Sequence, residues 1–170
     1  DFSDAMRNTR LGLRLAPHDP VVLLAAARFT TRIGSDEGLK YWQLYLDLQK
    51  PSRPERIEFI ESAIRMNWLE AAMNEVNAAL RESPKDLELV LLRVRVAGRR
   101  MNHPLAEQLA REAARQFPLE TAPRALLGEL LLSGTNETSR LNARRLLWPM
   151  ALDPSPDRKS TRQNSSHITI

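Results

Sequence analysis

Three arginines recur along the chain at a nearly constant interval. Arg32, Arg65 and Arg99 are almost equally spaced in the sequence. The planar guanidinium group donates paired hydrogen bonds to a carboxylate or a phosphate, so a row of arginines would suit an acidic ligand. The alternative is structural, because an arginine near the end of a helix offsets the helix dipole and can satisfy terminal carbonyl groups. The choice depends on the elements that carry these arginines.

Few other residues have the types and spacing that catalysis or metal binding requires. Glu58 and Glu61 are close neighbours in the sequence, and such a pair can do acid–base work but on a helix is usually a solvated face. His18 and His103 lie in predicted turns beside prolines, and His167 lies near the C-terminus. None of the histidines has a second histidine four positions away. We therefore expect no catalysis, no cofactor and no metal site.

The composition predicts a folded, helical chain. Its 170 residues are 42% hydrophobic and 27% charged, enough for one domain with a core or for a short array of repeats. Aromatic residues are only 5%, and the abundance of Ala, Leu and Arg favours helices. The chain has no cysteine, which excludes a disulfide framework. The longest apolar run, residues 21–27, is far shorter than the roughly 20 residues that span a bilayer, so we expect no membrane segment.

The C-terminal residues differ from the rest of the chain. The stretch "DRKSTRQNSSHITI", residues 157–170, has no helical apolar face. It resembles a read-through tail of the "RKSTRLNSSH" type, and the alternative is a native disordered terminus or a phosphorylatable linker. We interpret residues 155–170 as a disordered, non-native tail and exclude them from function. Without this tail the net charge falls from +4 to +2, which gives little support for nucleic-acid binding.

Prolines end predicted helices at a regular interval. Pro17, Pro51, Pro84, Pro118 and Pro154 recur at intervals of 34, 33, 34 and 36 along the chain. A fixed period in this range is the signature of a stacked-repeat protein. An amphipathic segment precedes each proline and a second helical segment follows each of the first four, so each period is expected to form two antiparallel helices. The expected boundaries are a half-repeat, 1–17, and four repeats, 18–51, 52–84, 85–118 and 119–154.

The phase and content of this period resemble the tetratricopeptide repeat, a family of helix pairs stacked into a right-handed superhelix. The family's small-residue positions on the second helix fall on Ala72, Val76 and Ala79, on Ala106, Ala110 and Ala113, and partly on Ala5 and Gly12. Leu127, Gly128 and Leu131 match its first-helix pattern. Small side chains let two helix backbones approach closely. The resemblance covers residues 1 to about 154 and implies an all-α solenoid, a right-handed alpha-alpha superhelix.

Two segments depart from the family pattern. The second repeat has Leu39, Tyr41 and Trp42 where small residues are usual, so its register is open by one position. Pro149 lies within the last predicted helix, which it should kink or shorten. The chain also enters in a second helix and has no obvious polar capping helix, so we expect a piece of a longer array.

In this family the first helices line a concave surface that receives an extended peptide or a partner helix. The resemblance places three columns there: Leu24, Ile57 and Leu91; Arg28, Glu61, Arg95 and Glu129, of alternating sign; and Arg32, Arg65 and Arg99. The first column lacks the lysines and asparagines with which some members clamp a terminal carboxylate. The resemblance therefore implies a protein or peptide partner, acidic and with aliphatic anchors, and no small-molecule substrate.

Three hypotheses for function stay open. The one we favour is a non-enzymatic scaffold for protein–protein interaction. The second is the arm of a larger enzyme, such as a transferase whose catalytic domain lies outside these residues. The third is RNA processing, because "YWQLYLDLQ", residues 41–49, has the aromatic spacing of half-a-tetratricopeptide repeats, although on the second helix of its pair.

Overall fold

The computed structural model describes residues 2–133 and 137–152, with side chains described for residues 3–133 and 140–148. Within these ranges the chain forms nine helices and no strand, which confirms the predicted all-α class. The tail at 155–170, which the sequence predicts to be non-native, lies outside the described residues.

Two compact units divide the chain, Asp1–Asn102 and His103–Ile170. The first contains α1 (Phe2–Leu15), α2 (Pro20–Arg32), α3 (Glu37–Leu48), α4 (Arg53–Arg65), α5 (Leu69–Glu82) and α6 (Leu87–Arg99). The second contains α7 (His103–Gln116), α8 (Thr121–Ser133) and α9 (Glu137–Leu152). The division falls between α6 and α7, inside the repeat predicted at 85–118. His103, which we expected in a turn, is the first residue of α7.

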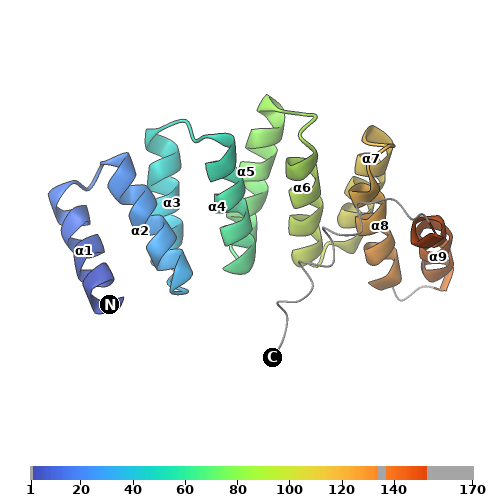
Figure 1. Cartoon of the computed structure of the whole chain (residues 1–170), viewed down its shortest axis with the longest axis horizontal. Helices are drawn as coiled ribbons and strands as arrows, with labels where there is room; N and C mark the ends of the chain where they lie inside the picture. The colour runs from blue at the N-terminus through green and yellow to red at the C-terminus, as the bar shows by residue number, and fades with distance from the viewer. Residues whose placement is uncertain (1, 134–136, 153–170) are drawn as a thin grey trace. The chain divides into compact units, whose positions relative to one another are not determined.

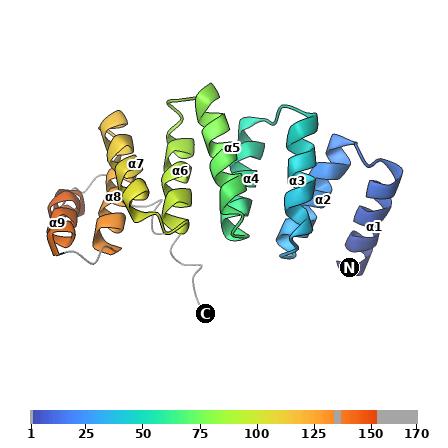
Figure 2. The same ribbon diagram turned by 180° about the vertical axis from the view of Figure 1, so that it is seen from behind.

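Helices of the first unit pack in two layers. α1 packs on α2, α2 on α3, α4 on α5 and α5 on α6, while α4 also contacts α6. The connections alternate between the two ends of the helices, so neighbours in the chain are antiparallel (Figure 1). α2 and α4 lie in front of α3 and α5 in Figure 1 and behind them in Figure 2. In the second unit, α7 packs on α8 and α8 on α9.

Three helices of the first unit begin after a polar N-cap residue. Asp19, Ser52 and Asp86 immediately precede α2, α4 and α6 and are almost equally spaced along the chain. The carboxylates of Asp19 and Asp86 accept hydrogen bonds of 2.7–3.3 Å from first-turn N–H groups. At α4 the Glu55 carboxylate accepts from the backbone N–H and the hydroxyl of Ser52, both at 2.7 Å. These local bonds satisfy donors that a helix start leaves without partners.

The same three helices end in a shared backbone conformation. Gly34, Asn67 and Met101 adopt positive φ angles of 73°, 61° and 58°, the left-handed conformation that often ends a helix. In each case the next residue donates its N–H to a carbonyl five positions earlier, at 2.8–3.2 Å. The carbonyl groups at these helix ends are therefore satisfied by the backbone itself.

Small residues recur on the second helices and define their buried face. Gly38, Trp42 and Tyr45 are the buried residues of α3. The equivalent buried residues are Ala72, Val76 and Ala79 in α5, and Ala106, Ala110 and Ala113 in α7. The register that the sequence left open is therefore fixed by Gly38, which lies one repeat period before Ala72. A Cβ at Gly38 would lie 2.6 Å from Thr31 Oγ1 and 3.0 Å from a ring carbon of Trp68.

Trp42 is the largest side chain in the core of the first unit. It is fully buried, and its ring centroid lies 6.3 Å from that of Tyr45 and 5.6 Å from that of Phe59. Its Nε1 donates a hydrogen bond of 3.2 Å to Thr31 Oγ1, so the polar tip of the indole is satisfied. This cluster joins α2, α3 and α4 through contacts that span repeats.

In the second unit, Leu127, Gly128 and Leu131 of α8 are buried. A Cβ at Gly128 would lie 2.6 Å from Cγ of Leu147, so α9 approaches α8 where the glycine leaves room. α9 continues past Pro149 to Leu152, and the expected shortening does not occur. Pro149 lies in the last turn of α9, so only three residues follow it before the helix ends.

Substitutions at two glycines distinguish the effect of close packing on stability from the effect of helix propensity. Gly38→Ala should lower the free energy of unfolding by about 1–3 kcal/mol, because the added methyl group meets Thr31. The matched change Gly12→Ala should be neutral or stabilising by up to about 1 kcal/mol, since its nearest contact is a Val22 methyl at 3.3 Å. Chemical denaturation measures both. A Gly38→Ala protein as stable as Gly12→Ala would contradict the close approach of α3 to α2.

Met101→Gly should stabilise the protein. The residue combines a positive φ with a side chain that is 75% exposed, so the substitution removes little packing. We expect a gain of about 1 kcal/mol in the free energy of unfolding, because glycine adopts this conformation without a steric penalty. Gly34→Ala is the reciprocal control and should be destabilising. A loss of stability on Met101→Gly would show that the Met side chain contributes more than its conformation costs.

Candidate functional site

The arginine row, which we define as Arg32, Arg65 and Arg99, occupies equivalent places in the first unit. Each arginine is the last residue of its helix, in α2, α4 and α6 respectively. All three are exposed. Among the described side chains, none of the three forms an ion pair. The row is therefore a set of charged groups at one end of three helices.

The arginine row does not cap the helices through hydrogen bonds. The terminal carbonyls accept bonds from backbone N–H groups of the following turns. The side-chain bond of Arg65 goes to the hydroxyl of Ser62, at 2.8 Å, and not to a carbonyl. Of the two structural roles open to these arginines, only the favourable interaction with the helix dipole remains.

In the second predicted column, Arg28 is already bound by a carboxylate of the protein itself. Arg28 of α2 donates hydrogen bonds of 2.6–3.1 Å to both carboxylate oxygens of Glu58 in α4. The hydrogen bond to Glu58 raises the pKa of Arg28. Glu61 and Arg95 are exposed and form no ion pair within the described part of the chain. Arg28 therefore links two first helices and leaves Glu61 and Arg95 as the available charges.

The apolar column is more buried than the sequence suggested. Ile57 is only 9% exposed and belongs to the core. Leu24 and Leu91 are half-buried. α2 and α6 thus offer some aliphatic surface next to the charged columns, while α4 offers little.

Charges near the opposite end of the first helices are paired. Arg53 at the start of α4 binds Asp86 at 2.6 Å and Glu88 at 2.8 Å, both at the start of α6. The hydrogen bond from Arg53 holds the pKa of Asp86 below its usual value. Together with the pair between Arg28 and Glu58, these contacts connect successive first helices and leave the arginine row without comparable partners.

A four-residue network connects α4 with α5. Glu82 lies 3.0 Å from Lys50 and 2.7 Å from Arg56, and the same Arg56 lies 3.4 Å from Glu75. Hydrogen bonds from Lys50 and Arg56 lower the pKa of Glu82. Burial has the opposite effect on Glu75 and raises its pKa. The two carboxylates of one network therefore respond oppositely to acid.

The aromatic residues of α3 are part of the core. Trp42 and Tyr45 are 0% and 1% exposed, and burial raises the pKa of the Tyr45 hydroxyl. A side chain that stacks on a nucleic-acid base must present its face to the surface. Trp42 and Tyr45 do not, so neither ring is available to stack on a base.

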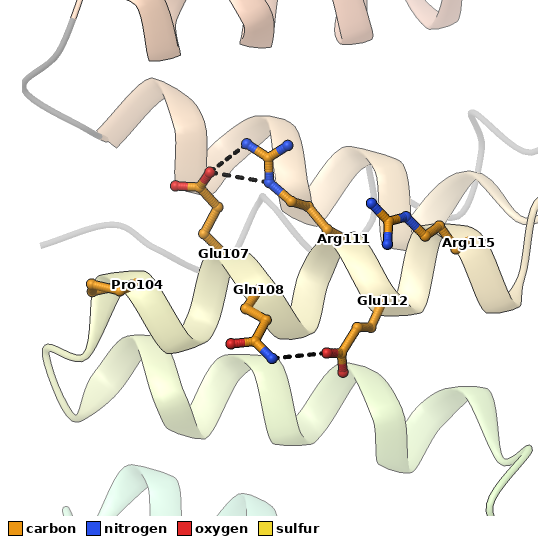
Figure 3. Close-up of a pocket in the computed structure, with 6 residues that line it drawn as sticks. All are labelled: Pro104, Glu107, Gln108, Arg111, Glu112 and Arg115. Atoms are coloured by element: carbon orange, nitrogen blue, oxygen red, sulfur yellow. Dashed lines mark hydrogen bonds and ion pairs between the residues drawn. The ribbon is translucent and has the colours of Figure 1, made fainter.

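A shallow depression on α7 has no arrangement suited to catalysis. It is lined by Pro104, Glu107, Gln108, Arg111, Glu112 and Arg115. Figure 3 shows the contacts between Arg111 and Glu107 and between Gln108 and Glu112, each joining residues four positions apart on the helix. Such pairs are typical of a solvated helix face.

Several features of this surface could not be read from local sequence. The partner of Arg28 lies far along the chain, on another helix. Glu58 and Glu61, the two carboxylates considered for acid–base work, do not act as a pair, because Glu58 is bound by Arg28. The position of Gly38 did carry a signal, since it lies one repeat period before Ala72.

Within the described residues, no group of His, Asp and Glu side chains could hold a metal ion, and no helix is long and apolar enough to cross a membrane. His18 lies in a turn, as expected, and His167 lies outside the described residues. No protein-family model and no curated protein matches the chain.

Glu75→Gln should increase stability at neutral pH and have no effect in acid. A raised pKa means that ionised Glu75 opposes folding above its folded pKa, and that this penalty disappears as pH falls and the group is protonated. We expect the melting temperature to rise by roughly 1–4 °C at pH 7 and the difference to vanish near pH 4.

The Glu82→Gln variant is the control of opposite sign. A lowered pKa contributes stability above the unfolded value, which is lost as pH falls through the folded pKa. This variant should therefore be less stable than the parent at neutral pH and converge with it in acid. Equal behaviour of the two variants in thermal melts would show that burial of Glu75 is not the dominant effect.

Proposed function

We propose that the chain is a non-enzymatic scaffold of tetratricopeptide type, whose helix pairs stack into a right-handed superhelix and bind a protein or peptide partner. Three recurrences support the repeat: the helix starts at Asp19, Ser52 and Asp86, the left-handed residues at Gly34, Asn67 and Met101, and the small residues at Gly38, Ala72 and Ala106. Each set recurs with the period that the prolines mark. Stacked repeats of this size present extended binding surfaces.

The observation that carries the proposal is the unpaired arginine row. Elsewhere on these helices Arg28, Arg53 and Arg56 are engaged by carboxylates. The exposed arginines of the row have neither a carboxylate partner nor a capping hydrogen bond within the described residues. Guanidinium groups that no carboxylate of the fold engages are available to a partner, and arginine is enriched among residues that dominate binding.

The same surface offers a limited aliphatic contribution. Leu24 and Leu91 are half-buried and lie two turns before Arg32 and Arg99 on the same helices. Residues spaced by four positions follow one face of a helix. A partner laid across α2, α4 and α6 would therefore meet apolar side chains beside charged ones, which is the composition of a specific interface.

Peptide display against the whole chain tests the proposal. A random library should yield enriched peptides, and changing Arg32, Arg65 and Arg99 together to Gln should weaken their binding by tenfold or more while leaving thermal melting unchanged. The melting curve matters because the dipole interaction of the row is the structural alternative.

The matched control changes Arg10, Arg14 and Arg81 to Gln. These exposed arginines of α1 and α5 form no ion pair with described side chains. Both triple variants replace three arginines, so the net charge of the protein changes equally in the two. The control should retain binding. Enrichment of no peptide, or equal loss in both triple variants, would refute binding at the arginine row; loss of stability with intact binding would assign the row to the helix ends.

A further inference from the structure

The charge and hydrogen-bonding groups of the arginine row indicate which chemical groups its ligand must carry. Three guanidinium groups stand at the C-terminal ends of α2, α4 and α6. Two nearby carboxylates are held by other arginines, Glu58 by Arg28 and Glu70 by Arg100. A third, Glu61, lies four positions before Arg65 on α4 and forms no ion pair with the described side chains. A row of like charges with no internal partner is complementary to a row of anionic groups.

The elements that carry the row set its spacing. α4 contacts α6 directly, and the pair between Arg28 and Glu58 joins α2 to α4. Packed helices have axes about 8–10 Å apart, so Arg65 and Arg99, the last residues of α4 and α6, are expected to repeat at about that distance. An extended chain advances about 3.3 Å per residue, which makes every third residue coincide with the next arginine.

Apolar side chains accompany the row. Ile33 follows Arg32 directly and is 36% exposed, and Met101 lies just after Arg99 and is 75% exposed. A ligand that meets the arginines with its acidic side chains would place intervening residues near these apolar groups. Burial of such surface adds affinity that charge alone does not provide.

From these observations we infer that the arginine row binds an extended segment of a partner protein with acidic side chains at every third residue and aliphatic residues between them. This inference rests on the proposed function and specifies the ligand of the same surface. Each carboxylate accepts paired hydrogen bonds from one guanidinium group, so binding depends on the register of the charges as well as on their number.

Fluorescence anisotropy with synthetic peptides and the full chain tests the inference. The test peptide has about ten residues, with aspartate at the first, fourth and seventh positions and leucine or valine among the others. A permuted peptide has the same composition with the three aspartates adjacent, and a third carries asparagine in their place. The spaced peptide should bind about tenfold tighter than the permuted one and about a hundredfold tighter than the asparagine peptide.

Protein variants assign the effect to the row. Each single change of Arg32, Arg65 or Arg99 to Gln should weaken the spaced peptide by about fivefold, and Arg→Lys changes should restore only part of the affinity, because lysine lacks the planar fork. The triple Gln variant at Arg10, Arg14 and Arg81 should bind as the parent does. Binding should weaken with rising ionic strength.

Four outcomes would overturn the inference. Equal affinity for the spaced and permuted peptides would show attraction by net charge alone. Equal weakening in the two triple variants would place the contact outside the row. Tighter binding of single-stranded RNA than of the spaced peptide would assign the row to phosphate. If peptides selected by display bind through the arginine row but lack acidic residues at every third position, this inference is overturned and the proposed function is not. If no peptide binds, both are overturned.

Discussion

The approach of α3 to α2 depends on the absence of a side chain at Gly38. A methyl group there would lie 2.6 Å from Thr31 Oγ1, and that same oxygen accepts the hydrogen bond of the buried Trp42 indole. The close approach of α3 to α2, the hydrogen bond of the Trp42 indole to Thr31 and the packing of Trp42 on Phe59 therefore depend on one another. In α5 the positions equivalent to Gly38 and Trp42 are Ala72 and Val76, and both are buried.

Helix ends provide the second constraint, because they decide which groups remain available on the surface. The left-handed residues at Gly34, Asn67 and Met101 close three helices by backbone hydrogen bonds. A terminus closed in this way does not need a side chain to satisfy its carbonyls. The arginine that ends each helix keeps a favourable position in the helix dipole and remains exposed.

Charge is distributed unevenly along the first helices. Near their starts, Arg53 bridges to Asp86 and Glu88, and in the middle of α2 Arg28 bridges to Glu58. These exposed pairs contribute modestly to stability, and they connect successive first helices. At the other end the arginine row lacks such bridges, and this contrast connects the fold to the proposed binding surface.

The sequence by itself determined the elements. Amphipathic segments and the prolines that end them act within a few residues, so the positions of the helices and their all-α class could be predicted from local chemistry. The period also identified Ala72, Val76 and Ala79, which are buried in α5, because a face defined by helical spacing is a local property.

Tertiary structure decided how those elements meet. Three features involve residues from different helices. They are the close approach to α2 that makes Gly38, and not Leu39, the small-residue position of α3; the burial of Ile57; and the pairing of Arg28 with Glu58. The contrast between paired charges at one end of the first helices and unpaired ones at the other also involves different helices. Such features depend on which faces come together and at what distance, and a pattern along the chain specifies the faces of single helices without specifying their partners.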